Sequence, residues 1–75
     1  MKTIEIRLKT LEDVRNFVNI VTRYDIDIDL SSGRYVVDAK SIMGIFSLDL
    51  LSPITLTAHS ENTEKLFGEL APYII

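Results

Sequence analysis

The stretch DAKSIMGIFSLDLL, residues 38–51, begins with small and polar residues and continues as a dense apolar run. Ser41 is a natural N-cap, and the apolar residues after it recur at helical spacing, which predicts a helix over 41–50. Gly44 lies inside this helix, where glycine costs up to ~1 kcal/mol relative to alanine, so we expect a packing reason for it. The stretch therefore predicts a helix but leaves open whether its apolar side chains are core or surface.

Alternation of apolar and polar residues predicts four strands around this helix. Strands are expected over 2–8 (KTIEIRL), 26–31, 34–39 and 53–58. The second and third form a hairpin, because Gly33 in the intervening SSG accepts the positive φ of a tight turn. The aspartates of DIDID alternate with isoleucines, so we expect them on the solvent face of the hairpin.

Apolar residues at helical spacing predict two more helices, over 11–23 and 61–71. Thr10 is the predicted N-cap of the first of these helices, and Ser60 or Asn62 is the predicted N-cap of the last. Pro72 ends the last helix. The element order is βαββαβα. Helices that follow the first, third and fourth strands can all cover one face of the sheet, which predicts an α+β open-faced sandwich.

Composition limits the function classes. The 75 residues predict one domain over 1–75, and 47% apolar residues argue against disorder. The chain has no cysteine, no apolar run near the ~20 residues of a membrane span, and a net charge of −3 that disfavours nucleic acid. A single histidine among scattered acids is a weak basis for a metal site. We expect a cytoplasmic protein that binds no cofactor, metal, nucleic acid or membrane.

The segment AKSIMGIFSLDL, residues 39–50, in this element order resembles the HPr family, the histidine-containing phosphocarriers of the bacterial sugar phosphotransferase system. KSIMG followed by S-L in register is the most specific part. DIDIDL before the hairpin and ITLTAHSEN before the last helix agree more loosely with the family pattern. The resemblance covers most of the chain. It implies a four-stranded antiparallel sheet with three helices on one face.

The loop between the first strand and the first helix departs from the family. In that loop the family carries a histidine, which accepts phosphate, and an arginine close to it. The histidine lies at a helix N-terminus, where free N–H groups and the positive end of the helix dipole favour a phosphate. Here the sequence is LKTLEDVRNF, which is about three residues shorter than the family's segment. Leu11, Glu12 and Asp13 occupy the positions where the family has Ala, Arg and Pro. An ungapped alignment places Thr10 at the histidine position. We expect no phosphocarrier activity of the family's kind, since the two carboxylates repel a phosphate.

His59 is the only histidine. It too precedes a helix and could be a relocated acceptor, but Glu61 and Glu64 are its charged neighbours and no arginine is close in sequence. We interpret it as an exposed loop histidine.

Ser41 is the candidate regulatory phosphorylation site. In family members from Gram-positive bacteria, the serine before I-M-G is the target of a dedicated kinase, and the phosphorylated form docks on a transcriptional regulator. One branch, the catabolite-repression HPr homologues, lacks the histidine and keeps this serine, and IEIRLKT and AKSIMG resemble that branch. The candidate partner-binding residues are Ile42, Met43 and Phe46. The simpler alternative is that Ser41 only caps a helix, worth about 1 kcal/mol, and that the three apolar residues belong to the core.

Three functions remain open. The first is a non-catalytic HPr-like regulatory or binding module, with a serine kinase or a transcriptional regulator as its protein partner. The second is a working phosphocarrier whose acceptor has been relocated. The third is a structural interaction domain, such as a homodimer formed through strand edges or the apolar tail PYII.

Overall fold

The computed structural model describes residues 1–75 and has the predicted βαββαβα order followed by one turn of 3₁₀ helix. The strands are β1 (Lys2–Ile6), β2 (Ile28–Ser32), β3 (Tyr35–Asp38) and β4 (Ile54–Ala58). The helices are α1 (Leu11–Val21), α2 (Ile42–Phe46), α3 (Glu64–Glu69) and the 3₁₀ helix η1 (Ala71–Tyr73). No helix is both long and apolar enough to cross a lipid bilayer.

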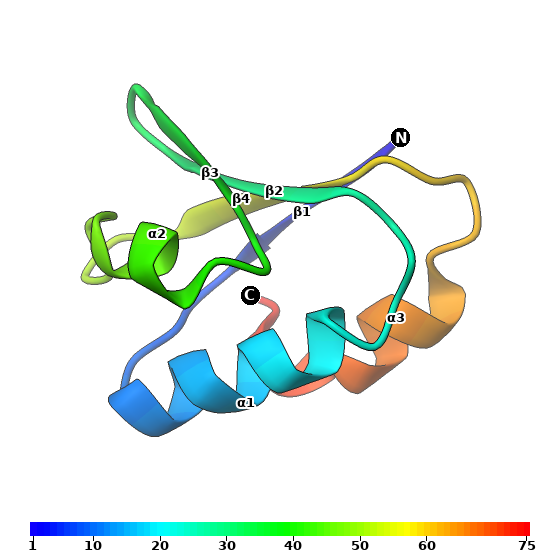
Figure 1. Ribbon diagram of the computed structural model, residues 1–75, viewed down its shortest axis with the longest axis horizontal. Coiled ribbons are helices and arrows are strands. Elements are labelled where there is room, and N and C mark those ends of the chain that lie inside the picture. Colours follow the sequence, from blue (N-terminus) through cyan, green and yellow to red (C-terminus); the bar gives the residue numbers. More distant parts are fainter.

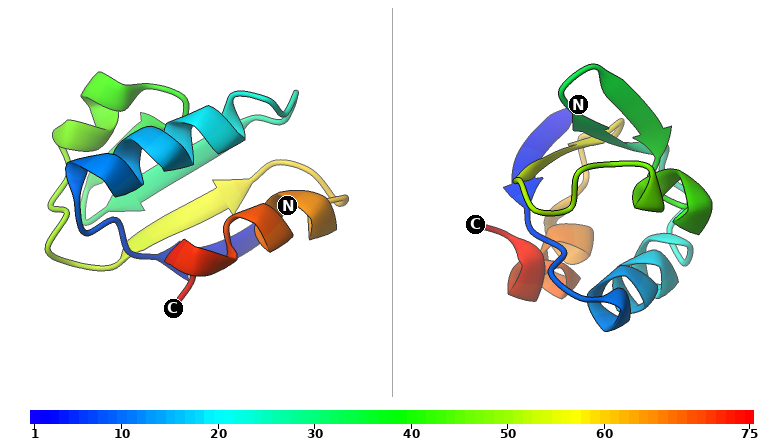
Figure 2. Two further views of the ribbon diagram at one scale, coloured as in Figure 1. Left: turned by 90° about the horizontal axis from the view of Figure 1, so that it is seen from below. Right: turned by 90° about the vertical axis from the view of Figure 1, so that its left-hand side faces the viewer.

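The strands form one sheet in the order β1-β4-β2-β3, and each neighbouring pair is antiparallel. All three α-helices lie on the same side of this sheet, as Figures 1 and 2 show. The predicted α+β sandwich, with a four-stranded antiparallel sheet and three helices on one face, is confirmed.

The two faces of the sheet differ in chemistry. Side chains that face the helices are apolar and buried, among them Ile6, Ile28, Leu30, Ile54 and Leu56. The residues that alternate with them are polar and none is buried: Thr3, Glu5, Asp29, Ser31, Thr55 and Thr57. The helix-facing side is thus the core, and the other side is open to solvent.

Helix α1 contributes Val14, Phe17 and Val21 to this core, at the spacing that places them on one side of the helix. The ring of Phe17 meets Tyr73 edge to face, with centroids 6.3 Å apart and an interplanar angle of 86°. This contact joins α1 to the C-terminal segment.

The C-terminal end of α1 is also tied to α3 by polar contacts. Glu69 accepts a hydrogen bond from the Tyr24 hydroxyl and, at 3.0 Å, one from Arg23 Nη2. The hydrogen bond with Tyr24 lowers the pKa of Glu69, and the same bond raises the pKa of Tyr24. These contacts fix the orientation of α3 against α1.

The predicted second helix is wrong in its length. It was expected over 41–50, but α2 ends at Phe46. Ser47 Oγ donates to Gly44 O at 2.6 Å, and Asp49 accepts bonds from Leu51 N and Ser52 Oγ, both at 3.0 Å. Short polar side chains that bond to nearby backbone in this way compete with a helix, so the chain turns instead.

The predicted start of the last helix is also wrong. Neither Ser60 nor Asn62 caps α3, because Ser60 Oγ accepts from Asn62 N at 3.1 Å and closes a turn before the helix. Thr63 is the N-cap, and its side chain makes no capping bond. The other predicted boundaries of the strands and of α1 lie within two residues of the observed ones, which is the usual spread between assignments.

Candidate functional site

Ser41 lies between β3 and α2 as the N-cap of α2, as predicted. Its Oγ accepts a hydrogen bond from Gly44 N at 3.1 Å, and its own backbone N–H donates to Asp38 O at 3.0 Å. The carboxylate of Asp38 accepts from Lys40 N at 2.9 Å, so the connection before α2 is itself held by hydrogen bonds. The Ser41 side chain is exposed, and its hydroxyl donates no hydrogen bond to the protein.

Gly44 has the packing reason that the sequence suggested. A Cβ atom at this position would lie 3.1 Å from Val37 Cβ and 3.2 Å from Ser41 Oγ. Glycine therefore allows α2 to approach β3 closely while Ser41 keeps its capping position.

The short helix α2 has one buried and one exposed side. Ile45 is fully buried and anchors the helix in the core, whereas Met43 is 77% exposed and Phe46 is 46% exposed. Ile42 is half-buried and packs against the edge of the core. We call Ile42, Met43 and Phe46 the α2 patch. It follows Ser41 directly in the chain, and its exposed surface comes mainly from Met43 and Phe46.

A groove of about 430 Å³ runs beside the α2 patch, between α1 and α2. Its lining is mostly polar and comprises Glu12, Arg15, Asn16, Val18, Asn19 and Ile42. Ile42 is thus shared between the groove and the α2 patch. From α1 the groove adds a carboxylate, a guanidinium and two amides to the apolar surface of α2.

The start of α1 is closed by its own side chains. Thr10 caps the helix as predicted, since its Oγ1 accepts from Asp13 N at 3.0 Å. Asp13 Oδ2 in turn accepts from Lys9 N at 3.0 Å. With Glu12 next to it, the first turn carries two carboxylates, and neither an imidazole nor a guanidinium is present there.

His59 is exposed, as predicted, and its ring contacts an acid. Its Nε2 lies 2.8 Å from Asp29 Oδ2, and its backbone N–H donates to Asp27 O. Glu61 accepts a hydrogen bond at 2.9 Å from the N-terminal ammonium group of Met1, which lowers the pKa of Glu61. The connection over residues 59–63 and the start of α1 lie at opposite ends of the molecule (Figures 1 and 2).

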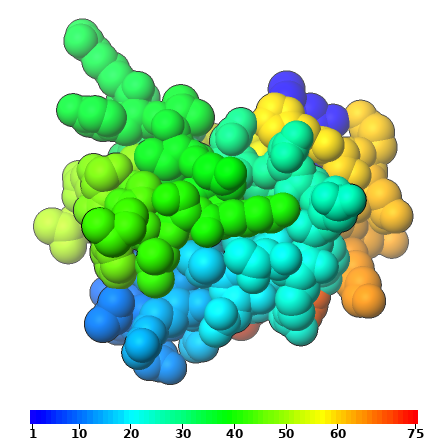
Figure 3. All heavy atoms as spheres, viewed as in Figure 1, coloured from blue at the N-terminus to red at the C-terminus, as the bar shows by residue number.

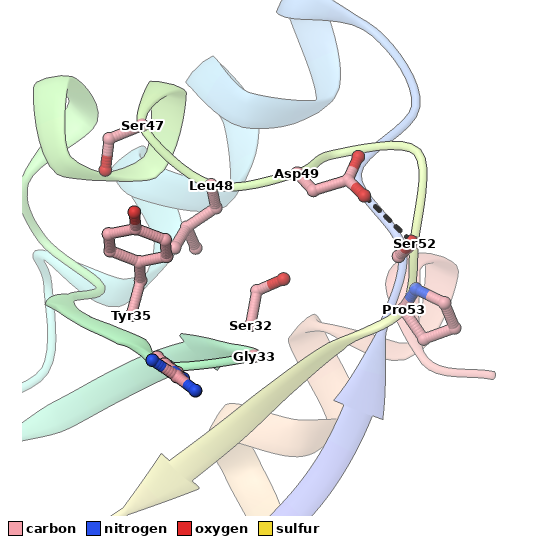
Figure 4. A pocket seen from close by; sticks show the side chains of 9 residues that line it. Ser32, Gly33, Tyr35, Ser47, Leu48, Asp49, Ser52 and Pro53 are labelled. Atoms are coloured by element: carbon pink, nitrogen blue, oxygen red, sulfur yellow. Dashed lines mark hydrogen bonds between the residues drawn. The ribbon is translucent and has the colours of Figure 1, made fainter.

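A second hollow, of about 660 Å³, was not predicted from the sequence. It lies between the β2–β3 hairpin and the connection from α2 to β4, and Figure 4 shows Tyr35 pointing toward Ser47 across it. Its lining is Ser32, Gly33, Arg34, Tyr35, Ser47, Leu48, Asp49, Ser52 and Pro53. None of the predicted site residues lines this hollow. No group of three His, Asp or Glu side chains is placed to hold a metal ion.

Comparison with known families decides the identity of this fold. Residues 13–74 match the sequence model of a family described as "PTS HPr component phosphorylation site". The chain belongs to the HPr family. The resemblance inferred from KSIMG is thereby confirmed, and the match runs from the first turn of α1 into the C-terminal segment.

HPr-family relatives agree in sequence and in structure. The chain is 36% identical over 76 aligned positions to the HPr-like protein Crh of Bacillus subtilis, covering 95% of this chain and 89% of the relative. A phosphocarrier HPr from Bacillus anthracis superposes with a TM-score of 0.73 at 32% identity, covering 99% of this chain and 94% of that one. HPr-C-His from Thermoanaerobacter tengcongensis superposes with a TM-score of 0.79 at 28% identity, covering 96% and 89%.

Proposed function

We propose that this HPr-family chain is a non-catalytic regulatory module related to the phosphoenolpyruvate-dependent sugar phosphotransferase system. In this proposal a serine kinase phosphorylates Ser41, and a protein partner reads the modified serine together with the α2 patch. The observation that carries the proposal is the placement of an exposed N-cap serine beside apolar side chains that the fold leaves exposed.

Phosphorylation of Ser41 is compatible with the fold. The Ser41 oxygen would attack the γ-phosphorus of ATP, forming an O–P bond while the bond to ADP breaks and the hydroxyl proton leaves. A phosphate at an N-cap faces the N–H groups and the positive end of the helix, so the helix can keep its start. The added charge would lie next to Met43 and Phe46, which gives a partner both an anion and an apolar contact to recognise.

The alternative of a working phosphocarrier finds less support. A phosphate at the start of α1 would meet Glu12 and Asp13 in the first turn, and like charges oppose binding there. A phosphate on His59 would lie beside the carboxylate of Asp29. The connection over residues 59–63 also lies at the other end of the molecule from the start of α1 (Figure 1). We therefore propose that neither position accepts phosphate.

Labelling with two phosphoryl donors tests these functions against each other. One sample receives ATP and a serine kinase that accepts HPr-family proteins, and the other receives phosphoenolpyruvate and enzyme I. We expect one phosphate per chain from ATP and no acid-labile phosphate from phosphoenolpyruvate, both measured by intact mass. An HPr protein that keeps its histidine serves as the positive control for the second reaction.

Other outcomes would favour the other functions. Stoichiometric labelling from phosphoenolpyruvate that disappears in His59→Ala would establish a relocated acceptor and overturn the proposal. Labelling from neither donor, with both enzymes active on the control protein, would leave a structural interaction domain as the remaining function.

A further inference from the structure

The residues on either side of Ser41 both reach helix α1. Lys40 Nζ donates to Tyr24 O at 2.8 Å, just beyond the C-terminal end of α1. Ile42 lines the groove of about 430 Å³, and every other residue of that groove belongs to α1. Figure 3 shows the green residues at the start of α2 lying directly against the blue and cyan residues of α1. Ser41 is therefore held close to α1, between a contact at the end of that helix and a contact with its middle.

Two side chains of α1 in this groove are free to bind an anion. Arg15 is exposed and makes no ion pair, and the side-chain amide of Asn19 is exposed and has no hydrogen-bond partner. Residues four apart lie one above the other on the same side of a helix. Glu12, the acid of the groove, lies one turn before Arg15, away from the end of α1 that Lys40 reaches. An unpaired guanidinium and an unpaired amide thus share the side of α1 that faces α2.

We propose that a phosphate on Ser41 binds Arg15 and Asn19, and thereby fastens the start of α2 to α1. The inference rests on the proposed phosphorylation of Ser41. The guanidinium is a planar fork on a long stem, so it can reach across the groove and donate two hydrogen bonds to one phosphate. The Asn19 side chain adds an N–H donor. A phosphoserine has three terminal oxygens, which accept more hydrogen bonds than these two side chains donate, so a partner can bind the same phosphate.

The other charges near Ser41 leave this role to Arg15. Asp38 and Glu12 oppose a phosphate, but the Asp38 carboxylate already accepts the Lys40 N–H at 2.9 Å. The Lys40 ammonium group is itself bonded to the carbonyl of Tyr24. Arg15 is therefore the cation of this region that is left to pair with the phosphate. Because the pair is exposed to water, its effect on stability is modest.

Thermal unfolding of synthetic chains tests the pairing. A chain of 75 residues is short enough for chemical synthesis with phosphoserine at position 41, so the test needs no kinase. Phosphorylation should change the Tm of the parent chain more favourably than that of Arg15→Gln, by about 2 °C or more, because only the parent gains the ion pair. The pKa of the phosphate should also be lower in the parent than in Arg15→Gln, since a neighbouring cation favours the charged form.

Arg34→Gln is the matched control. It removes the same charge from the turn between β2 and β3, where Arg34 is exposed and makes no ion pair. The Tm of this variant should respond to phosphorylation as the parent does. In nuclear magnetic resonance spectra of the parent, the side-chain N–H signals of Arg15 and Asn19 should shift when position 41 carries the phosphate.

Two results would overturn the inference. One is an equal response of Tm to phosphorylation in the parent and in Arg15→Gln. The other is side-chain signals of Arg15 and Asn19 that do not change on phosphorylation. The proposed function can fail separately: if no serine kinase modifies Ser41, but the synthetic phosphoserine chain shows the Arg15-dependent gain in Tm, that function is refuted and the pairing stands.

Discussion

Replacing Ser41 by alanine should abolish phosphorylation of this chain by a serine kinase that accepts HPr-family proteins. The Ser41 hydroxyl is exposed and donates to no protein group, so it is free to react. In the proposed function, the α2 patch beside it would give the kinase an apolar contact. Initial rates of phosphate transfer from ATP measure the effect, and we expect the rate for Ser41→Ala to fall to background.

The alanine variant also loses the cap on α2, which is worth about 0.5–2 kcal/mol. Ser41→Asn separates the two effects, because asparagine is a good N-cap that has no hydroxyl to phosphorylate. We expect Ser41→Asn to be as stable as the parent chain. Like Ser41→Ala, it should not be phosphorylated. Ser47→Ala removes another exposed serine of the same segment and should be phosphorylated normally. Phosphate transfer that persists in both Ser41 variants would place the modified residue elsewhere.

Replacing Phe17 by alanine should lower the free energy of unfolding by about 3–5 kcal/mol. Phe17 is fully buried, packs against Tyr73 edge to face, and joins α1 to the C-terminal segment. Small domains have only about 5–15 kcal/mol of stability in total, so this single change should leave the protein close to unfolded at 37 °C. Urea unfolding followed by circular dichroism measures the loss.

Leu11→Ala is the matched control in the same helix. The Leu11 side chain is exposed, so its removal should change the free energy of unfolding by less than about 1 kcal/mol. A loss below about 1 kcal/mol for Phe17→Ala would contradict the core described here, because a fully buried phenylalanine cannot be removed at so small a cost.

The sequence predicted the architecture well, because the core residues recur with the period of the element that carries them. Val14, Phe17 and Val21 follow the helical period, and Ile28 and Leu30 alternate as strand residues do; all five are buried. A small domain must bury nearly all such residues in one core, so these periods were enough to locate both elements.

The ends of α2 and α3 could not be predicted in the same way. Leu48 and Leu50 continue the apolar run of α2, but Ser47 and Asp49 bond to nearby backbone and side-chain groups and turn the chain. At α3, Ser60 was an equally good cap by residue type, yet it closes the preceding turn instead. Both outcomes depend on local hydrogen bonds that compete with helix formation, which residue type alone does not rank.

The sequence predicted the capping residue of the candidate site, but it did not decide which apolar side chains of α2 are exposed. Ser41 fits a cap by type and position alone. Ile42, Met43, Ile45 and Phe46 are all apolar, so only the packing of Ile45 into the core decides which of them remain exposed. The hollow at the hairpin was missed because its lining comes from two separate segments, 32–35 and 47–53, whose approach depends on the folded chain.

In the proposed function, a partner protein recognises phosphorylated Ser41 together with the α2 patch. Titration calorimetry of a transcriptional regulator that binds Ser-phosphorylated HPr-family proteins tests it most directly. Charge-assisted hydrogen bonds are worth about 1.5–3 kcal/mol, so we expect the phosphorylated chain to bind at least about tenfold more tightly than the unmodified chain. The phosphorylated double variant Met43→Ala, Phe46→Ala should lose most of that affinity, while phosphorylated Leu51→Ala, which removes an exposed leucine outside the patch, should keep it. Equal affinity of the phosphorylated and unmodified chains would contradict the account.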